Sequence, residues 1–497
     1  MNKLTHKKCC LEIVGLGLIG AYCFLSAVFG ANFAKIHLSF SFIKIPLFIG
    51  EALLLVCAGI LVVLMINKRV LLTKEQYFFL GYLLVIVLWG GVDYFHYNNS
   101  ALAFRNSLLF FYPVFSLFTY SFYRRAFLKL WVKISLLSLL FIFGLYVKTY
   151  YSFVFLILGI LLLTGLKKPW NYILGFGFLA LWPYKEFLSE QRTWLVSSSV
   201  VILFFIYVIL RYFLNLRKSY RWVGGVVLSL ILIAGIWYFA DKGGLRSLVC
   251  PQEVIEFYRE EKKIIKEKKS THVAEHLDVG LYHNQKDNKE ISLKISPKKE
   301  LQITYYPLSI LSDQAAQSKV EVSPEDVVSS HFKRKSDGRN IQTAYVNIVF
   351  RLLIWEDMMG ELWQKKAVLG VGMGEPQRSR SIEILGWADG EWERDGWIAP
   401  HNSFLHLIYR AGIIGVGIIV VIFMLLQSLI RGFIDRRSMV GILLSGIIIY
   451  GLVAANFLLI LELPYYAIPF WSLLGLTLAY RRDLLLKERV IIHDDGR

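Results

Sequence analysis

Stretches of about 20 consecutive apolar residues recur along this chain and constrain its fold more than any other feature. Because a helix of about 20 apolar residues crosses a hydrocarbon core about 30 Å thick, each stretch predicts one membrane span. About twelve spans are expected on this basis, near 11–30, 46–66, 77–95, 107–123, 130–147, 151–166, 171–184, 193–215, 222–240, 403–430, 439–461 and 465–480. The composition agrees, since 56% of the residues are hydrophobic and only 19% are charged. The predicted fold class is an all-α polytopic membrane protein.

The positive charge of the chain is concentrated between the spans. A formal net charge of +18 would by itself suggest a surface for nucleic acids or anionic membranes. However, residues 241–400 hold 24 basic and 25 acidic residues, whereas the rest of the chain holds 31 basic and 12 acidic. The excess therefore lies in short segments such as Lys68–Arg69, Arg124–Arg125 and Arg436–Arg437, which excludes a nucleic-acid surface. By the positive-inside rule these segments and both termini are cytoplasmic, and 241–400 is an extracytoplasmic loop.

This topology divides the chain into four parts. Residues 1–240 form an N-terminal membrane domain of nine spans, 401–480 form a C-terminal membrane domain of three, and 481–497 form a cytoplasmic tail. In the large loop, 241–344 is a charged insertion with a predicted helix at 251–269 and a small β-hairpin at 291–305. Residues 345–400 differ, because apolar residues with helical spacing return there. No internal repeat is visible, which weighs against an inverted-repeat transporter.

The junction between this loop and the tenth span carries the clearest chemical signal. His401 stands at the outer mouth of that span, followed by Asn402, and then by Gly412 and Gly415 within the apolar run. In a regular helix three turns rise roughly 16 Å, so Gly412 would lie almost directly beneath His401. Glycines there would allow another helix or a lipid chain to approach closely. An imidazole above such a groove suits a lipid-linked substrate; a helix-capping histidine above an ordinary packing seam is the alternative.

Three segments together resemble the O-antigen ligase and polymerase family. They are His401-Asn402-x9-Gly412-x2-Gly415, Arg351-x3-Trp355 followed by Leu369-Gly-Val-Gly-Met-Gly374, and Ser189-Glu-Gln-Arg192-Thr-Trp. The motifs cover roughly 185–217 and 345–430. The resemblance implies a GT-C-like fold and an inverting transfer of a glycan from undecaprenyl diphosphate to an acceptor hydroxyl. Such a reaction takes place on the outer face of the bacterial cytoplasmic (inner) membrane, without a metal or another cofactor.

The resemblance also implies roles for individual residues. Arginine forks hold phosphate oxygens by charge-assisted bonds, so Arg192 and Arg351 are expected to bind the diphosphate. Arg105, at the outer end of the fourth span, is expected to add a third contact. His401 is the expected general base, because nearby arginines favour a neutral imidazole. The expected supporting residues are Asn402, Trp355, Gly412 and Gly415.

Weaker signals lie nearby in the sequence. Trp387, Trp392 and Trp397 offer faces for sugar stacking or anchors for the headgroup layer. The carboxylates among them, without His or Cys partners, are more typical of a solvated turn than of a metal site. Gly370-x-Gly372-x-Gly374 lacks the strand and the Lys-Ser/Thr of a nucleotide loop, so it predicts a turn that permits close backbone approach. His406 and Arg410, one turn apart inside the span, are functional candidates because ionisable groups are costly there.

The identity of the acceptor stays open at this level. A ligase would use a lipid A core sugar in lipopolysaccharide biosynthesis, a polymerase would use another glycan repeat unit, and a protein O-oligosaccharyltransferase would use a Ser or Thr hydroxyl. A single large outer loop favours the ligase. A lipid-linked glycan transporter is disfavoured, because the ionisable candidates cluster at the outer rim rather than at the bilayer midplane.

Overall fold

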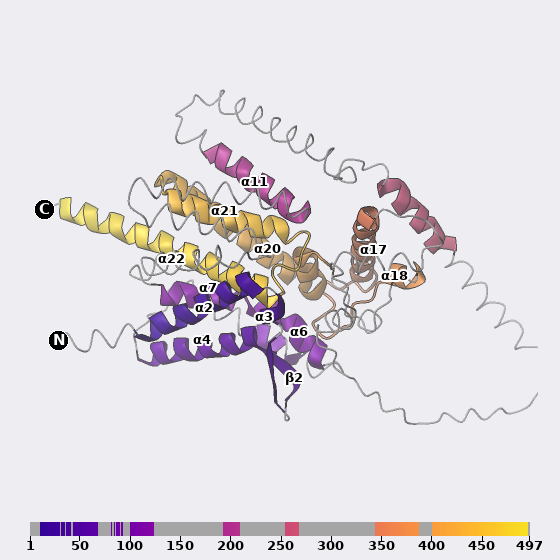
Figure 1. Ribbon diagram of the computed structural model, residues 1–497, viewed down its shortest axis with the longest axis horizontal. Coiled ribbons are helices and arrows are strands. Elements are labelled where there is room, and N and C mark those ends of the chain that lie inside the picture. Colours follow the sequence, from indigo (N-terminus) through magenta and orange to yellow (C-terminus); the bar gives the residue numbers. More distant parts are fainter. Residues whose placement is uncertain are drawn as a thin grey trace, which may run out of the picture. The chain divides into compact units, whose positions relative to one another are not determined.

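The computed structural model describes residues 10–29, 31–34, 36–40, 43–67, 81, 84, 86–89, 91–92, 100–123, 192–208, 254–267, 343–385, 387 and 400–495. Most of them are helical (Figure 1). In chain order the elements are α2 (Cys10–Phe29), α3 (Ala31–Ala34), β1 (His37–Phe40), β2 (Ile43–Phe48), α4 (Ile49–Ile66), α6 (Ser100–Phe111), α7 (Val114–Phe122), α11 (Arg192–Val208), α17 (Thr343–Gln364), α18 (Arg380–Leu385), α20 (Ser403–Asp435), α21 (Met439–Ala454) and α22 (Pro464–Asp495). A further helix covers 254–267, which confirms the helix predicted in the charged insertion.

Three helical stretches are long and apolar enough to cross a membrane: Ile49–Ile66, Leu102–Phe122 and Ser403–Asp435. They coincide with the second, fourth and tenth predicted spans. Shorter apolar helices at Leu11–Ser26, Val196–Phe205 and Val440–Ala454 lie in the first, eighth and eleventh. The fifth, sixth, seventh and ninth predicted spans lie outside the described residues, so the total of twelve stays a prediction. α22 continues through most of the predicted tail, up to Asp495.

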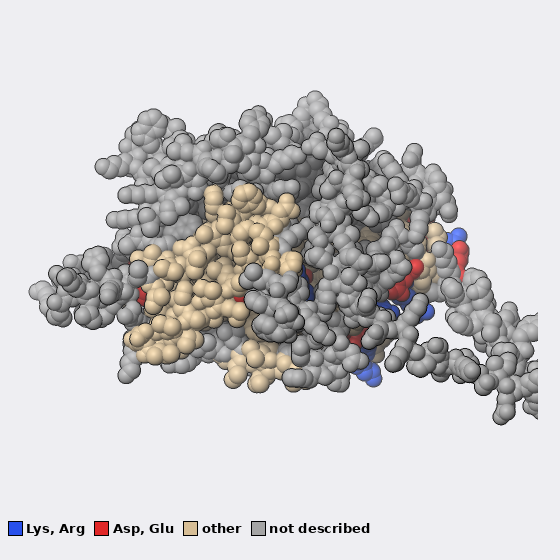
Figure 2. Space-filling view, turned by 60° about the horizontal axis from the view of Figure 1, so that its bottom comes forward, with Lys and Arg blue, Asp and Glu red and all other residues tan. Residues whose placement is uncertain are grey.

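The surface of α4 explains why a membrane suits this fold. Leu55, Val62 and Ile66 are exposed to between 53% and 74%, while Cys57 and Leu64 are fully buried on its other side. A helix that is apolar on its exposed face as well as on its buried face is more stable in a lipid environment than in water. The described face in Figure 2 is correspondingly dominated by uncharged residues.

The chain separates into two compact units. Unit 1 comprises Met1–Gly235, Leu362–Glu375 and Ala399–Arg497, and unit 2 comprises Ile236–Glu361 and Pro376–Ile398. These limits lie close to the predicted loop boundaries at 241 and 400. The difference is the segment Leu362–Glu375, which the sequence assigns to the outer loop but which packs with the membrane helices of unit 1.

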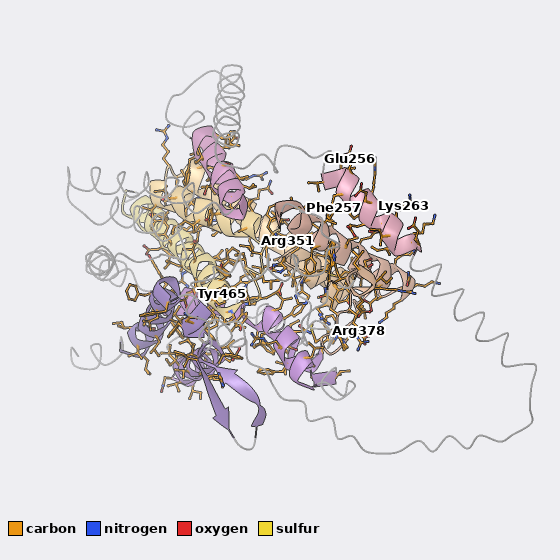
Figure 3. The ribbon with its side chains drawn as sticks, turned by 45° about the vertical axis from the view of Figure 1, so that its right-hand side comes forward. Glu256, Phe257, Lys263, Arg351, Arg378 and Tyr465 are labelled. Atoms are coloured by element: carbon orange, nitrogen blue, oxygen red, sulfur yellow. The ribbon has the colours of Figure 1, made fainter. Side chains whose placement is uncertain are left out.

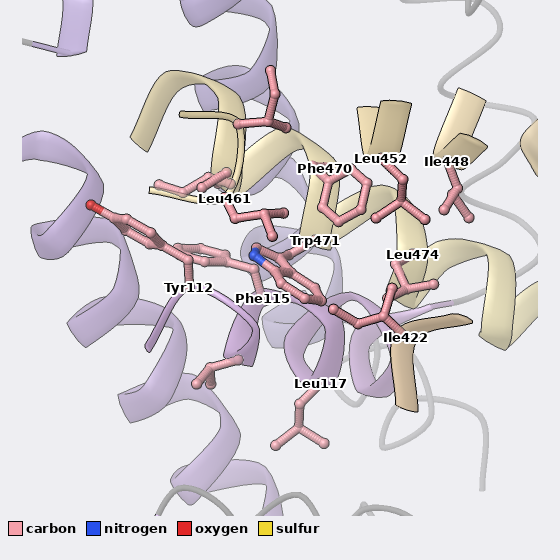
Figure 4. Packing of buried hydrophobic residues seen from close by; sticks show 14 of the residues in the cluster. Tyr112, Phe115, Leu117, Ile422, Ile448, Leu452, Leu461, Phe470, Trp471 and Leu474 are labelled. Atoms are coloured by element: carbon pink, nitrogen blue, oxygen red, sulfur yellow. The ribbon is translucent and has the colours of Figure 1, made fainter. Parts of the chain in front are cut away.

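The core of unit 1 is formed where α22 runs along α7 and where α11 runs along α21. Trp471 and Leu474 of α22 belong to the same buried cluster as Phe115 of α7, and Figure 4 shows Trp471 beside Phe115. The two helices approach so closely that a Cβ on Gly475 would lie 2.1 Å from the carbonyl oxygen of Ser116. Close helix approach at a small residue is the packing mode that membrane helices favour.

A small β-hairpin interrupts the helical architecture. β1 pairs antiparallel with β2, with His37 opposite Phe48 and Leu38 opposite Leu47. The described residues are mostly helical, in agreement with the predicted all-α class, and the pair of strands β1 and β2 is the exception. The alternation of apolar and polar residues in 37–45 was the available signal, but the strands are only 4 and 6 residues long and β2 runs into the apolar stretch predicted as the second span. The hairpin predicted at 291–305 lies outside the described residues.

Candidate functional site

The helix that follows His401 is broken at Gly412. This residue has φ 53° and ψ −128° inside α20, a conformation that essentially only glycine adopts. In a continuous helix the Ile413 amide would bond to the Tyr409 carbonyl, but here it donates to Val368 O at 2.9 Å. Tyr409 O accepts from Val371 N at 2.9 Å instead. The segment 368–375, which we call the glycine turn, thus supplies partners for backbone groups that the break releases.

The glycines of both segments are required by this close approach. A Cβ on Gly412 would lie 1.9 Å from Val368 O, and one on Gly370, at φ +82°, would lie 2.4 Å from Arg410 O. A Cβ on Gly415 would lie 2.3 Å from Leu407 O of the same helix. The prediction of a smooth groove beneath His401, open to another helix or a lipid chain, is therefore wrong at Gly412 and Gly415. The predicted close backbone approach of the glycine turn is confirmed.

Arg410 joins the turn to a buried polar group. Its side chain is only 2% exposed, and Nη1 donates to the carbonyls of Gly372, at 3.1 Å, and Glu375. Its Nε donates to His406 Nε2 at 3.1 Å, and His406 Nδ1 lies 2.8 Å from Glu462 Oε2. Because Nε2 accepts a hydrogen bond, the proton of a neutral imidazole is assigned to Nδ1, facing the carboxylate. The pairing of His406 and Arg410 follows from their helical spacing, whereas the sequence gave no sign of Glu462.

The glycine turn also reaches the helix that carries Arg105. Asn106 Nδ2 of α6 donates to Met373 O at 2.6 Å. The neighbouring Arg105 guanidinium stacks over the ring of Phe48, 4.7 Å from its centroid, and its charge interacts with Glu51. The turn therefore connects α20, which begins beside His401, with α6, which holds Arg105.

Glu51 is a buried carboxylate near Arg105 that sequence reasoning missed. Its side chain is only 3% exposed at the start of α4, where it accepts a hydrogen bond from the Phe48 amide. Tyr112 Oη donates to its other oxygen at 3.4 Å. The available signal was an acidic residue inside a predicted apolar span, which marks a functional candidate by default.

His401 precedes α20 without capping it. The N-cap is Asn402, whose Oδ1 accepts from the Leu405 amide at 3.0 Å. The alternative of His401 as the capping residue is therefore wrong. His401 is half-buried and has φ 50°, in the left-handed region. The fully buried Ser403 anchors this junction, because its amide donates to Ala455 O at 2.8 Å.

Arg351 belongs to unit 2. It is half-buried in α17 (Figure 3), and burial lowers its pKa, but an arginine stays charged at neutral pH. Trp355 follows one turn later on the same helix. Structure thus places Arg105, His401, Asn402, Gly412 and Gly415 in unit 1, and Arg351 and Trp355 in unit 2.

Two carboxylates directly after Trp355 attach neighbouring segments of unit 2 to α17. Glu356 accepts hydrogen bonds from Tyr258 Oη and from Lys262 Nζ of the 254–267 helix. Burial, together with Glu356, raises the pKa of Tyr258 to about 12, so its hydroxyl stays a donor at neutral pH. Asp357 accepts from the Oγ of Ser379 at 2.6 Å and from the amide and Oγ of Ser381 at 2.8 and 2.9 Å. α17 is therefore fixed to the 254–267 helix and to the start of α18.

Other predicted residues lie partly or wholly outside the described part of the chain. Arg192 is the first residue of α11, but its side chain is not among those described. Trp392, Trp397 and the carboxylates around them lie outside the described residues. Within the described ranges, no three His, Cys, Asp or Glu side chains come together as metal ligands would.

Comparisons with protein-family models, curated proteins and solved structures found no match to this chain. The resemblance to the O-antigen ligase and polymerase family therefore rests on the motif residues themselves. Their geometry in the two units is the basis for any functional argument.

Proposed function

We propose that the protein is a membrane glycosyltransferase of the O-antigen ligase type. It moves a glycan from undecaprenyl diphosphate to an acceptor hydroxyl on the outer face of the cytoplasmic membrane. The observation that carries the proposal is the glycine turn, which bonds to the backbone of the helix after His401 and, through Asn106, to the helix that holds Arg105. A backbone framework of this kind keeps a base and a phosphate-binding cation on rigid elements, as a transfer reaction requires.

In this proposal the arginines bind and stabilise the diphosphate leaving group. A departing lipid diphosphate carries about two negative charges, and each charge-assisted bond to it contributes about 1.5–3 kcal/mol. Arg351, Arg192 and Arg105 are the proposed ligands of these charges. Donors that are already in place where charge develops lower the barrier without reorganisation. The partial burial of Arg351 on α17 favours such a role, because a desolvated guanidinium interacts more strongly with an anion.

In this proposal His401 activates the acceptor hydroxyl. Its imidazole takes the proton from the acceptor hydroxyl while that oxygen forms a bond to the anomeric carbon. The bond from this carbon to the diphosphate oxygen breaks at the same time, so the configuration inverts and the bond electrons leave with the diphosphate. Asn402 caps the helix, so His401 stands directly before the N-cap, at the start of α20, where we propose that it acts as the general base.

Among possible acceptors we favour a lipid A core sugar. The single large predicted outer loop bears both Arg351 and His401, whereas two comparably large outer loops would favour a polymerase. Repeat-unit polymerisation and protein O-glycosylation use the same donor chemistry and differ only in the source of the hydroxyl.

The proposal is tested by transfer in vitro with the purified full-length protein in lipid nanodiscs. The donor is a polyprenyl-diphosphate-linked glycan, and lipid A core, free glycan and a Ser/Thr-rich protein are offered as acceptors, each with and without EDTA. We expect transfer to the lipid A core that persists in EDTA, with inversion at the anomeric carbon. Transfer to no acceptor, or transfer abolished by EDTA and restored by a divalent metal, would contradict the proposal.

A further inference from the structure

A buried chain of polar groups runs from the connection between α21 and α22 to the glycine turn. Glu462 lies next to His406 Nδ1, His406 Nε2 accepts from Arg410 Nε, and Arg410 Nη1 donates to carbonyls of the turn. All of these residues belong to unit 1. His406 and Arg410 are 7% and 2% exposed and the Glu462 side chain is 13% exposed, so the middle of this series of polar groups is shielded from water and its Glu462 end is partly so.

Such an arrangement is costly unless every member is in place. Buried charges lose their hydration, and a single missing partner leaves an uncompensated charge. His406 lies between the two charged groups, because its Nε2 accepts a hydrogen bond from the guanidinium of Arg410 and its Nδ1 lies 2.8 Å from the carboxylate of Glu462. Buried polar groups that contact one another in this way rigidify their surroundings.

This series of polar groups ends at the glycine turn. Arg410 contributes its own carbonyl to the Gly372 amide, at 3.2 Å, and its guanidinium to the Gly372 carbonyl, so it bonds the same residue from both sides. Arg410 binds the carbonyls of Gly372 and Glu375, and Met373 lies between these two residues in the sequence. The Met373 carbonyl accepts a hydrogen bond from Nδ2 of Asn106, the residue after Arg105. A continuous series of contacts therefore links Glu462 to α6.

We propose that Glu462 and His406 are positioning residues for the transfer reaction. They orient Arg410, Arg410 fixes the glycine turn, and the turn sets the relation between the His401 end of α20 and the Arg105 segment of α6. His406 itself does not act as the base, because both ring nitrogens face partners and the ring is buried. This inference rests on the proposed function, but its structural half is measurable without any substrate.

The test combines hydrogen–deuterium exchange with kinetics on the full chain in nanodiscs. The variants are Glu462→Gln, Glu462→Ala and His406→Ala. The matched control is Glu488→Gln, which removes a carboxylate from a half-exposed ion pair with Arg436 at the far end of α22. Exchange is followed at the Val371, Gly372 and Ile413 amides, which make the bonds between turn and kink.

We expect exchange at these amides to accelerate at least tenfold in Glu462→Ala and His406→Ala, and less in Glu462→Gln, which keeps a hydrogen-bond acceptor. The kcat of transfer should fall by about 10²-fold in the alanine variants, the scale of a misplacement of about 1 Å. The KM for the donor should change by less than about threefold, since the arginines stay in the chain. Glu488→Gln should alter neither quantity.

Unchanged exchange in both alanine variants would overturn the proposed link, whatever the activity. Accelerated exchange with an unchanged kcat would overturn the positioning role. A wild-type protein without transfer activity would instead contradict the proposed function, and the exchange data would still decide whether Glu462 and His406 control the turn. If the alanine variants do not fold, the Glu462→Gln variant decides by the same two measurements.

Discussion

The glycine turn of unit 1 and the segments that surround Arg351 in unit 2 are held by different means. The turn is bound by backbone hydrogen bonds to a broken helix and by one fully buried arginine. In unit 2 the side chains of Glu356 and Lys262 are 46% and 38% exposed in their ion pair. Buried networks fail when a single partner is removed, whereas exposed pairs contribute little. Single substitutions around the glycine turn should therefore have large effects. Substitutions in the contact between α17 and the 254–267 helix should have small ones.

The largest effect is expected for Gly412→Ala. A Cβ there would overlap the Val368 carbonyl, and φ 53° disfavours any side chain, so the free energy of unfolding should fall by at least about 3 kcal/mol. Gly417→Ala in the same helix is the control, because nothing lies within 4 Å of its added methyl. The measurement is the thermal unfolding midpoint in detergent. Equal midpoints for the two variants would remove the argument that the break needs glycine.

Arg351→Lys should affect activity without affecting the fold. A lysine keeps the charge but loses the two-pronged geometry that binds a phosphate, so the rate of transfer should fall by roughly 10- to 100-fold. Arg378→Lys, at an exposed position of unit 2, is the control. Initial rates with saturating acceptor check the prediction. Full activity of Arg351→Lys would argue against a diphosphate-binding role.

Asp357→Ala should weaken unit 2 to an intermediate degree. The substitution removes the acceptor of three hydrogen bonds from Ser379 and Ser381, and should cost about 1–3 kcal/mol. Exchange of the amides of α18 reports this loss. Glu383→Gln, an exposed carboxylate of the same helix, should leave them protected. If both variants behave alike, Asp357 does not anchor α18.

The smallest effect is expected for Lys262→Ala. An exposed pair with Glu356 contributes about 0–1 kcal/mol, and salt screens it. The control is Lys263→Ala, which changes the next residue in the sequence. Protection of the 254–267 helix against hydrogen–deuterium exchange should be nearly equal in the two variants. A large loss confined to Lys262→Ala would show that unit 2 depends on single partners as strongly as unit 1 is expected to.

Sequence reasoning succeeded where the signal is local. The apolar run of α4, the helix at 254–267 and the adjacency of His406 and Arg410 follow from composition and helical spacing alone. The break at Gly412 could not be found in this way, because it is stabilised by the glycine turn some forty residues earlier in the sequence, beyond the reach of a helical pattern.

Contacts between distant segments account for the other omissions. Glu462 meets His406 only because the α21–α22 connection folds back onto the start of α20, where Ser403 binds Leu458 O and the Leu461 amide. The capping role of Asn402 rather than His401 was within reach, since asparagine is among the preferred N-cap residues. A single sequence shows which residues have side chains suited to a reaction. Which of them come into contact depends on the packing of distant segments, and residue spacing does not reveal that packing.

The most direct test of the account is single-turnover glycan transfer by His401→Ala. Removing a general base should lower the rate by roughly 10²–10⁴-fold, while the thermal midpoint and the exchange of the Ser403 amide stay as in the wild type. That result would support His401 as the base of a glycan transfer. A correctly folded His401→Ala variant that transfers glycan at close to the wild-type rate would contradict it.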